Sequence, residues 1–221
     1  MLWAMKKLKW KDYDLIFSYL DELFPNADTE LHYETPFQLL TAVILSAQTT
    51  DKQVNKVTDG LFKKIRNPED ILKMWHKAFE NAIKSIGLYK WKAKHIYETS
   101  KILAENGWII PKEEKELIKL PWVWEKTAKV VLYVLYNKPV IAVDTHVHRI
   151  CNRLWIVQTK TPLQTSKLLE ERIPQQYKAI AHHCIILFWR YHCTARNPKC
   201  DNCRLSTLCL YYSKNYKKCQ K

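Results

Sequence analysis

Residues 120–152 read LPWVWEKTAKVVLYVLYNKPVIAVDTHVHRICN. A Leu-Pro pair opens this stretch, and from Ala128 to Leu135 its apolar residues recur at helical spacing. A short apolar run at 140–143 then leads to Asp144, a residue type that commonly caps the start of a helix. The stretch therefore predicts one helix entered through a turn and a second helix that begins just after Asp144.

Helix-start signals recur through the rest of the chain. Thr is followed three residues later by Gln at Thr35, Thr50 and Thr161, which is the pattern of a capping box. The run from Phe37 to Leu45 is apolar nearly all round, as in a helix buried in a core. Alternating strand patterns are scarce, because only residues 140–143 offer one. These patterns predict an all-α fold.

Composition limits the class of protein. With 221 residues, 47% of them hydrophobic, the chain is long enough for one compact domain or two small ones that share a core. Its 36 Lys and Arg against 22 Asp and Glu give a formal net charge of +14, which favours nucleic acid first and an anionic membrane second. No apolar run reaches the ~20 residues of a membrane span, and residues 1–14 lack the apolar stretch of a secretory signal. We therefore expect a cytoplasmic protein whose seven cysteines are ligands or free thiols.

Four cysteines near the C-terminus have the spacing C-x6-C-x2-C-x5-C: Cys193, Cys200, Cys203 and Cys209. A structural zinc site usually pairs two C-x2-C units, and here only one such pair exists. The compact, uneven spacing better suits a cubane iron–sulfur cluster, with zinc as the alternative. Cys151 and Cys184 stand in apolar helical segments and are expected to be inert buried thiols, whereas Cys219 lies outside the pattern.

Basic residues stand beside and between these cysteines. Arg190, Arg196, Lys199 and Arg204 place positive charge on short segments that a metal centre would hold rigid. A rigid basic loop can bind phosphates without a large ordering cost. The pattern favours a cluster that positions DNA over a cluster that carries electrons.

Several motifs in a fixed order resemble endonuclease III, a family of helix-hairpin-helix DNA repair enzymes. Alone, Lys126 is an ordinary helix lysine and Asp144 an ordinary cap. Together, the Leu-Pro hairpin, Lys126-Thr127-Ala128, Val143-Asp144-Thr145-His146 and the C-terminal cysteines match the family signature, as do Ser46–Thr50 and Ser85–Tyr89. The resemblance runs from about Leu15 to Leu210.

The resemblance implies two helical subdomains with a DNA cleft between them. Residues 28–138 would form a six-helix barrel that ends in the helix-hairpin-helix. Residues 1–27 and 139–221 would form a discontinuous subdomain in which the four cysteines bind one [4Fe–4S] cluster. We expect a monomer, because no apolar repeat suggests an assembly seam.

The resemblance also implies base-excision repair in a bacterial cytoplasm or nucleoid. The enzyme would be a bifunctional DNA N-glycosylase for oxidised pyrimidines and a lyase that cleaves 3′ to abasic sites by β-elimination. Double-stranded DNA with damaged bases or abasic sites would be its partner. Lys126 would attack the sugar of a flipped nucleotide, Asp144 would relay the proton, and Gln48 would fill the vacated space. Further DNA contacts would come from Trp122, Trp124, Thr127, Arg190, Arg196 and Lys199.

Other classes fit less well. Adenine-mismatch glycosylases use a glutamate in the helix before the Gln, where this chain has Thr41, Ala42 and Val43. The 8-oxoguanine glycosylases lack the four cysteines. A non-catalytic DNA-binding module is disfavoured by the presence of both Lys126 and Asp144. An iron–sulfur electron-transfer protein is disfavoured by the basic charge and by one cluster in a large helical chain.

The chain departs from the family at glycine positions. The family hairpin reads Leu-Pro-Gly-Val-Gly, whereas this chain has Trp122 and Trp124, and Trp189 also replaces a family Gly. Trp108 and Trp155 fall at expected turns. The chain has three Gly and nine Trp, where about fifteen Gly are usual for this length. One hypothesis is that UGA encodes glycine in this gene and has been read as tryptophan; the alternative is a Trp-rich homologue.

Overall fold

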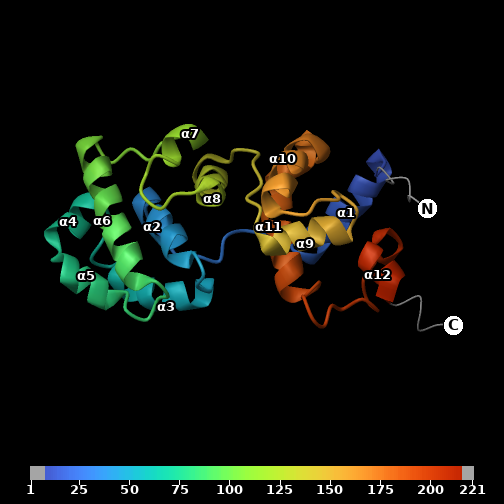
Figure 1. The fold of residues 1–221 in the computed structure, drawn as a ribbon, viewed down its shortest axis with the longest axis horizontal. Helices are drawn as coiled ribbons and strands as arrows, with labels where there is room; N and C mark the ends of the chain where they lie inside the picture. Colours follow the sequence, from blue (N-terminus) through green and yellow to red (C-terminus); the bar gives the residue numbers. More distant parts are fainter. Residues whose placement is uncertain (1–7, 216–221) are drawn as a thin grey trace. The chain divides into compact units, whose positions relative to one another are not determined.

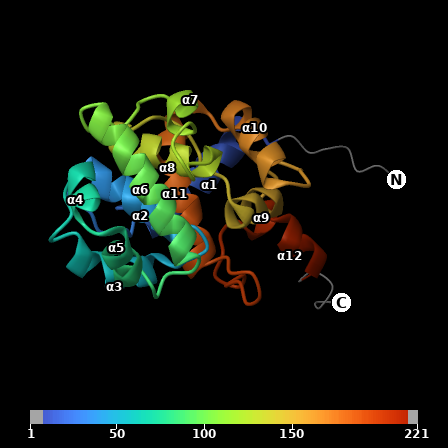
Figure 2. The ribbon, with the colours of Figure 1, turned by 60° about the vertical axis from the view of Figure 1, so that its left-hand side comes forward.

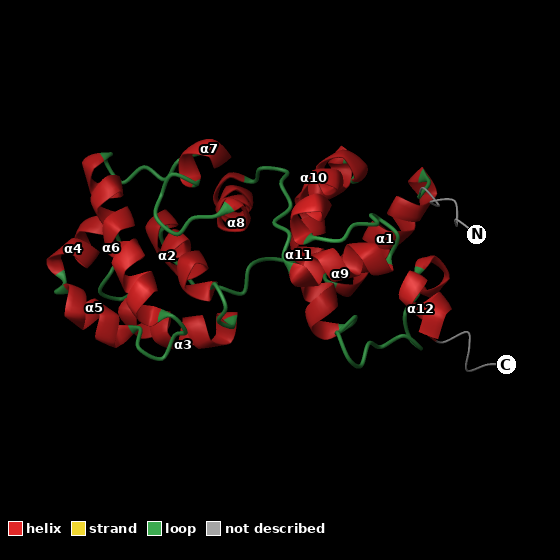
Figure 3. Cartoon of the chain, in the orientation of Figure 1, coloured by secondary structure: helices red, strands yellow, loops and turns green. Residues whose placement is uncertain are grey.

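The computed structural model describes residues 8–215, and the regular structure in that range is entirely helical (Figure 1, Figure 3). The prediction of an all-α fold is confirmed. The run at 140–143 forms no regular structure and pairs with no strand among the described residues. Cys219 lies outside the described residues. No helix in the described part of the chain is long and apolar enough to cross a membrane.

The described residues fall into two compact units, of which Thr29–Lys138 is the first. It contains six helices of six or more residues and one of four: α2 (Pro36–Ser46), α3 (Asp51–Leu61), α4 (Pro68–Lys73), α5 (His76–Ala82), α6 (Tyr89–Glu105), α7 (Glu114–Leu117) and α8 (Glu125–Tyr136). Helix α2 is the buried centre and packs against α3, α6 and α8, while α6 lies against α4 and α5 (Figure 2).

A capping box starts α2 as the sequence predicts. The Thr35 hydroxyl accepts a hydrogen bond from the Gln38 amide, and the Gln38 carboxamide oxygen accepts one from the Thr35 amide. Gln38 is fully buried, and its amide nitrogen donates to the backbone oxygens of Phe62 and Ile65. This side chain therefore ties the start of α2 to the loop after α3.

The second unit combines the described parts of 1–28 and 139–221. Its helices are α1 (Trp10–Leu23), α9 (Thr145–Arg153), α10 (Pro162–Arg172), α11 (Gln175–Tyr191), a 3₁₀ turn (Ser206–Leu208) and α12 (Leu210–Asn215). Helix α11 packs against α1 and α9 around buried apolar side chains such as Phe17, Ile185 and Phe188. Cys151 and Cys184 are buried in this core, as expected, and burial raises the pKa of Cys184 to about 11.

Three tryptophans have left-handed backbone conformations. The φ angles of Trp108, Trp122 and Trp155 are 66°, 63° and 59°, a region that bulky residues rarely adopt. Trp124 differs, because its φ is −91° at the start of α8, and Trp189 lies within α11. The hairpin therefore needs a left-handed residue at Trp122 but not at Trp124.

Candidate active site

The hairpin between α7 and α8 is a type II turn. The Val123 amide donates to the Leu120 carbonyl over 3.1 Å, so Pro121 and Trp122 occupy the two central positions. A type II turn favours Pro at the first central position and needs positive φ at the second, where glycine is the usual residue. The turn delivers the chain into α8, whose second residue is Lys126. The Lys126 side chain is exposed, so its unit alone does not desolvate the amine.

Asp51 is a carboxylate near Lys126 that the sequence analysis did not predict. Asp51 is the first residue of α3 and is only partly exposed. Burial raises the pKa of the Asp51 carboxyl above its ordinary value, and the positive charge of Lys126 opposes that shift. The two charges therefore interact, although no sequence pattern links residues so far apart along the chain.

Gln48 lies on the short loop between α2 and α3. Its side chain is exposed and its φ is 56°, a left-handed value for a residue other than glycine. The loop is held by Lys92 of α6, whose amine donates to the backbone oxygens of Leu45 and Ala47 and to the Thr49 hydroxyl. Lys92 was not predicted from the sequence, because an isolated lysine carries no signal of burial.

Asp144 caps α9, as its sequence position indicates. Its Oδ1 atom accepts hydrogen bonds from the amides of His146 and Val147, both over 2.8 Å. The two bonds fix the orientation of the Asp144 side chain. Asp144 belongs to the second unit, whereas Lys126 and Gln48 belong to the first.

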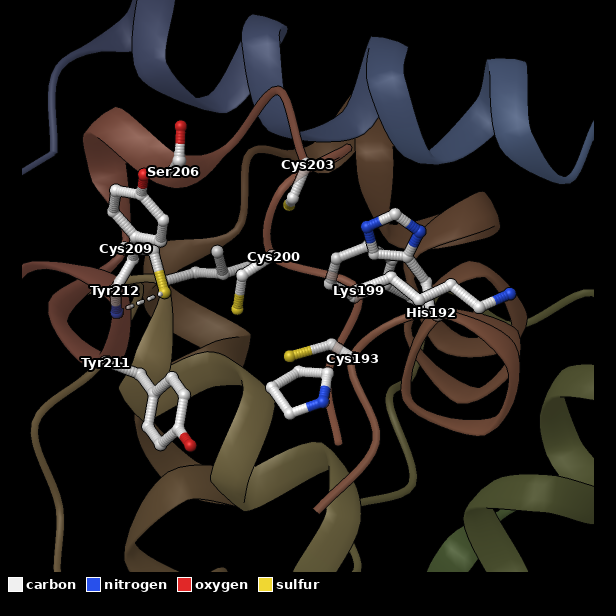
Figure 4. A pocket seen from close by; sticks show the side chains of 12 residues that line it. His192, Cys193, Lys199, Cys200, Cys203, Ser206, Cys209, Tyr211 and Tyr212 are labelled. Carbon is white, nitrogen blue, oxygen red and sulfur yellow. Dashed lines mark hydrogen bonds between the residues drawn. The ribbon is translucent and has the colours of Figure 1, made fainter. Parts of the chain in front are cut away.

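The four cysteines predicted to be ligands line one pocket (Figure 4). Leu154, Phe188 and Tyr211 line it with them, so the thiols share an apolar surrounding. Figure 4 shows the sulfur atoms of Cys193, Cys200 and Cys209 turned toward a common space. Four convergent thiols in a mostly apolar pocket suit a thiolate-ligated cluster. Among residues 8–215, no three or more His, Cys, Asp or Glu side chains lie close enough together to hold a single metal ion.

Hydrogen-bond donors reach two of these sulfurs. Arg153 donates to Cys193 Sγ over 3.2 Å and to the Thr194 carbonyl over 3.0 Å, and its guanidinium lies 4.0 Å from the ring centre of Tyr211. The Tyr212 amide donates to Cys209 Sγ over 3.4 Å. Such bonds stabilise thiolates and tune a cluster bound to them. Arg153 was not predicted, because it lies on α9, far from the cysteines in sequence.

The basic residues of the second unit have two kinds of environment. Arg196 and Lys199 are exposed on the loop that joins Cys193 to Cys200. Arg190 lies in the last turn of α11, beside the Trp189 ring. Arg204 instead forms an ion pair with Glu22 and stacks over Tyr19. Arg196 and Lys199 are therefore accessible to solvent, whereas Arg204 is engaged within its own unit.

Comparison with known proteins identifies the family. Residues 41–175 match the family model described as HhH-GPD superfamily base excision DNA repair protein, and residues 193–209 match the iron-sulfur binding domain of endonuclease III. The chain is 43% identical over 213 residues to endonuclease III of Bacillus subtilis (strain 168), covering 96% of this chain and 97% of that one. The chain belongs to the endonuclease III family.

Other relatives and solved structures agree. Endonuclease III of Escherichia coli (strain K12) is 42% identical over 201 residues, 90% of this chain and 95% of that one. A trapped endonuclease III–DNA covalent intermediate matches with a TM-score of 0.87 at 41% identity, covering 94% of this chain and 98% of that one. A thermostable thymine-DNA glycosylase matches with a TM-score of 0.81 at 26% identity, covering 92% and 98%. As an endonuclease III family member, the chain is a base-excision repair enzyme of the glycosylase/lyase class with a [4Fe–4S] cluster.

Proposed function

We propose that this chain removes oxidised pyrimidines from double-stranded DNA and cleaves the strand 3′ to the resulting abasic site. The observation that carries the proposal is Lys126 at the first turn of α8, directly after the type II hairpin. A glycosylase that activates only water does not need an amine at this position, whereas a lyase needs one to form a Schiff base. A bacterial cytoplasm is the proposed location and a monomer the proposed state.

In the proposed reaction, the neutral amine of Lys126 attacks C1′ of a nucleotide rotated out of the duplex. A C–N bond forms, and the bond between C1′ and the base breaks with its electron pair leaving on the base. The sugar ring then opens to a Schiff base between Lys126 and C1′. Loss of a proton from C2′ is followed by cleavage of the C3′–O bond, which releases the 3′ strand. Because Lys126 is exposed on its unit, we propose that the bound nucleotide itself excludes water from the amine.

We propose that Asp144 stabilises positive charge on the sugar and moves the proton during these steps. The two backbone bonds at Oδ1 support this role, since a fixed carboxylate needs no reorganisation when charge develops. Asparagine at this position would keep a cap oxygen but lose the negative charge. Asp144→Asn should therefore slow base release while leaving α9 intact.

DNA contacts are proposed from both units. The hairpin residues Trp122 and Trp124, together with Thr127, would meet the backbone near the lesion, and Gln48 would fill the space left by the flipped nucleotide. Arg190, Arg196 and Lys199 would bind phosphates. Because these contacts replace counterions on DNA, binding should weaken steeply as the salt concentration rises.

We propose that Cys193, Cys200, Cys203 and Cys209 hold the cluster. When bound, the cluster supplies a four-point cross-link that keeps its loops rigid. The exposed Arg196 and Lys199 lie between the first two of these cysteines, so the cross-link fixes the basic loop directly. This arrangement supports a role in DNA positioning.

The test uses two labelled duplexes, one with a single oxidised pyrimidine and one with a single abasic site. We expect base release and 3′ cleavage from the first and cleavage from the second. Lys126→Ala should lose both activities but keep the cluster absorption and DNA binding. Base release without cleavage would indicate a monofunctional glycosylase. Binding without either reaction would instead indicate a non-catalytic DNA-binding module.

A further inference from the structure

Lys92 is a buried lysine of α6 whose amine reaches the C-terminal end of α2. Its side chain is fully buried, and its amine donates to Leu45 O over 2.9 Å, Ala47 O over 2.6 Å and Thr49 Oγ1 over 3.2 Å. The first two oxygens belong to the last turn of a helix, where carbonyls lack partners within the helix and attract positive charge. Lys92 therefore closes the end of α2 with a single ammonium group.

The three acceptors bracket Gln48 along the chain. Gln48 has left-handed backbone geometry, which costs about 1–2 kcal/mol for a residue with a Cβ atom. Such strain persists only where the surrounding structure holds it. Gly87 lies on the loop before α6, and a Cβ atom there would stand 3.7 Å from both Gln48 O and Thr49 Oγ1. The Gln48 loop is thus held by Lys92 and lies beside the backbone at Gly87.

Burying an ammonium group against neutral oxygens carries an energetic penalty. The three acceptors of Lys92 are two carbonyls and a hydroxyl, and burial lowers the pKa of Lys92 to about 8. A methionine of similar length would close the same space without this penalty. A helix end can also be satisfied by water or a glycine turn. The cost indicates that the exact position of the loop matters.

We propose that Lys92 is a positioning residue that holds Gln48 ready to enter the space left by the flipped nucleotide. The proposal rests on the role of Gln48 in the proposed function. The three acceptors of Lys92 lie at the end of α2 and on the loop after it, so Lys92 acts through that loop. Loss of Lys92 should therefore slow the reaction only on duplex DNA, where the flipped nucleotide leaves a gap in the stacked bases.

The test compares Lys92→Met with Gln48→Ala and the double variant on two abasic substrates. One substrate is a duplex, and the other is a single strand, which leaves no gap in a paired stack. Gln38→Leu serves as the matched control, because Gln38 is also fully buried in this unit and binds two loop carbonyls, but at the opposite end of α2. All variants are assayed below the unfolding temperature of the least stable one.

We expect Lys92→Met to slow cleavage of the duplex about tenfold or more, as small misplacements in active sites do, with little change on the single strand. The double variant should be no slower than Gln48→Ala alone, and Gln38→Leu should not favour one substrate. Equal losses on both substrates, or additive effects with Gln48→Ala, would overturn the positioning role. No cleavage of either substrate by the parent chain would instead contradict the proposed function.

A separate observation concerns the left-handed tryptophans. Trp155 follows the C-cap of α9, the position where helices most often end with glycine. Trp122 occupies the glycine position of a type II turn. Trp108 follows Gly107, and both residues are left-handed. The ring centres of Trp189 and His146 lie 3.8 Å apart, and the buried Nε1 of Trp189 has no hydrogen-bond partner. The three left-handed sites suit glycine better than tryptophan, and at Trp189 the indole leaves a buried donor unsatisfied.

From these sites we infer that the natural protein has glycine at Trp108, Trp122, Trp155 and Trp189, encoded by UGA. The gene sequence and the mass of the protein from its own host test the inference together. We expect UGA codons at these positions and a mass lower by one Trp-to-Gly difference for each. UGG codons, or UGA codons with a mass that fits tryptophan, would overturn it.

Discussion

Alanine and glycine should have opposite effects at two classes of tryptophan. Trp108, Trp122 and Trp155 have φ near +60°, whereas Trp91 lies within helix α6 and is 57% exposed. Replacing each tryptophan with either Ala or Gly removes the same indole, so lost packing largely cancels in the comparison. What remains is the preference of each backbone site for a residue with or without a Cβ atom.

The magnitude follows from two opposing terms. A Cβ atom in left-handed geometry costs about 1–2 kcal/mol, whereas the greater freedom of glycine in the unfolded chain costs about 0.5–1 kcal/mol. At the three left-handed sites, Gly should therefore be more stable than Ala by roughly 0.5–1 kcal/mol. At Trp91 the order should reverse by about 1 kcal/mol, because a helix interior favours Ala. In a chain of this size, each 1 kcal/mol difference in stability shifts the unfolding temperature by about 2–4 °C.

Denaturant titrations and thermal melts of the four Gly and Ala pairs, with the cluster intact, measure these differences. Gly should be favoured at three sites and disfavoured at one. The reasoning is refuted if Ala equals or exceeds Gly at the left-handed sites. The same result at Trp91 as at the other three would show that composition, not backbone geometry, controls the outcome.

Three further predictions concern charges. Because burial lowers the pKa of Lys92 to about 8, folding below that pH buries a charged amine, so stability should rise as the pH increases from about 8 toward 10. Urea titrations should show that Lys92→Met removes this rise, worth up to about 3 kcal/mol. Because burial raises the pKa of Asp51 above 3.8, folding disfavours its charged form, so stability should fall as the pH rises through the range just above 3.8; urea titrations should show that Asp51→Asn removes this fall, and an unchanged pH profile would contradict it. Arg153→Leu removes the hydrogen bond to Cys193, so the visible absorption of the cluster should fade faster with a chelator than in the parent chain.

The sequence predicted the features that depend on local spacing. The all-α class, the cap at Asp144 and the capping box at Thr35 follow from residues close in the chain. At Thr50 the side chain does accept from the Gln53 amide, but the Gln53 side chain donates to Ser85 instead of completing a box. Tertiary contacts thus changed a local pattern.

The site was predictable where residues share a motif and not where packing brings them together. The four cysteines line one pocket because short loops separate them. Lys92 and Asp51 were not predicted, because their partners are distant in sequence. Lys92 holds the loop after α2, and the charge near Asp51 is that of Lys126 on α8. Trp122 has left-handed geometry because it occupies the second central position of the turn, whereas Trp124 has a φ of −91° because it is the N-cap of α8.

The most direct test of the central claim is borohydride trapping on a duplex with one abasic site. We predict a covalent protein–DNA adduct from the chain with Gly at Trp108, Trp122, Trp155 and Trp189, because a Schiff base to Lys126 is reduced to a stable amine. The adduct should vanish in Lys126→Ala while the cluster absorption remains. An adduct that persists without Lys126, or none from the glycine chain with its cluster intact, would contradict the assignment of Lys126 as the nucleophile.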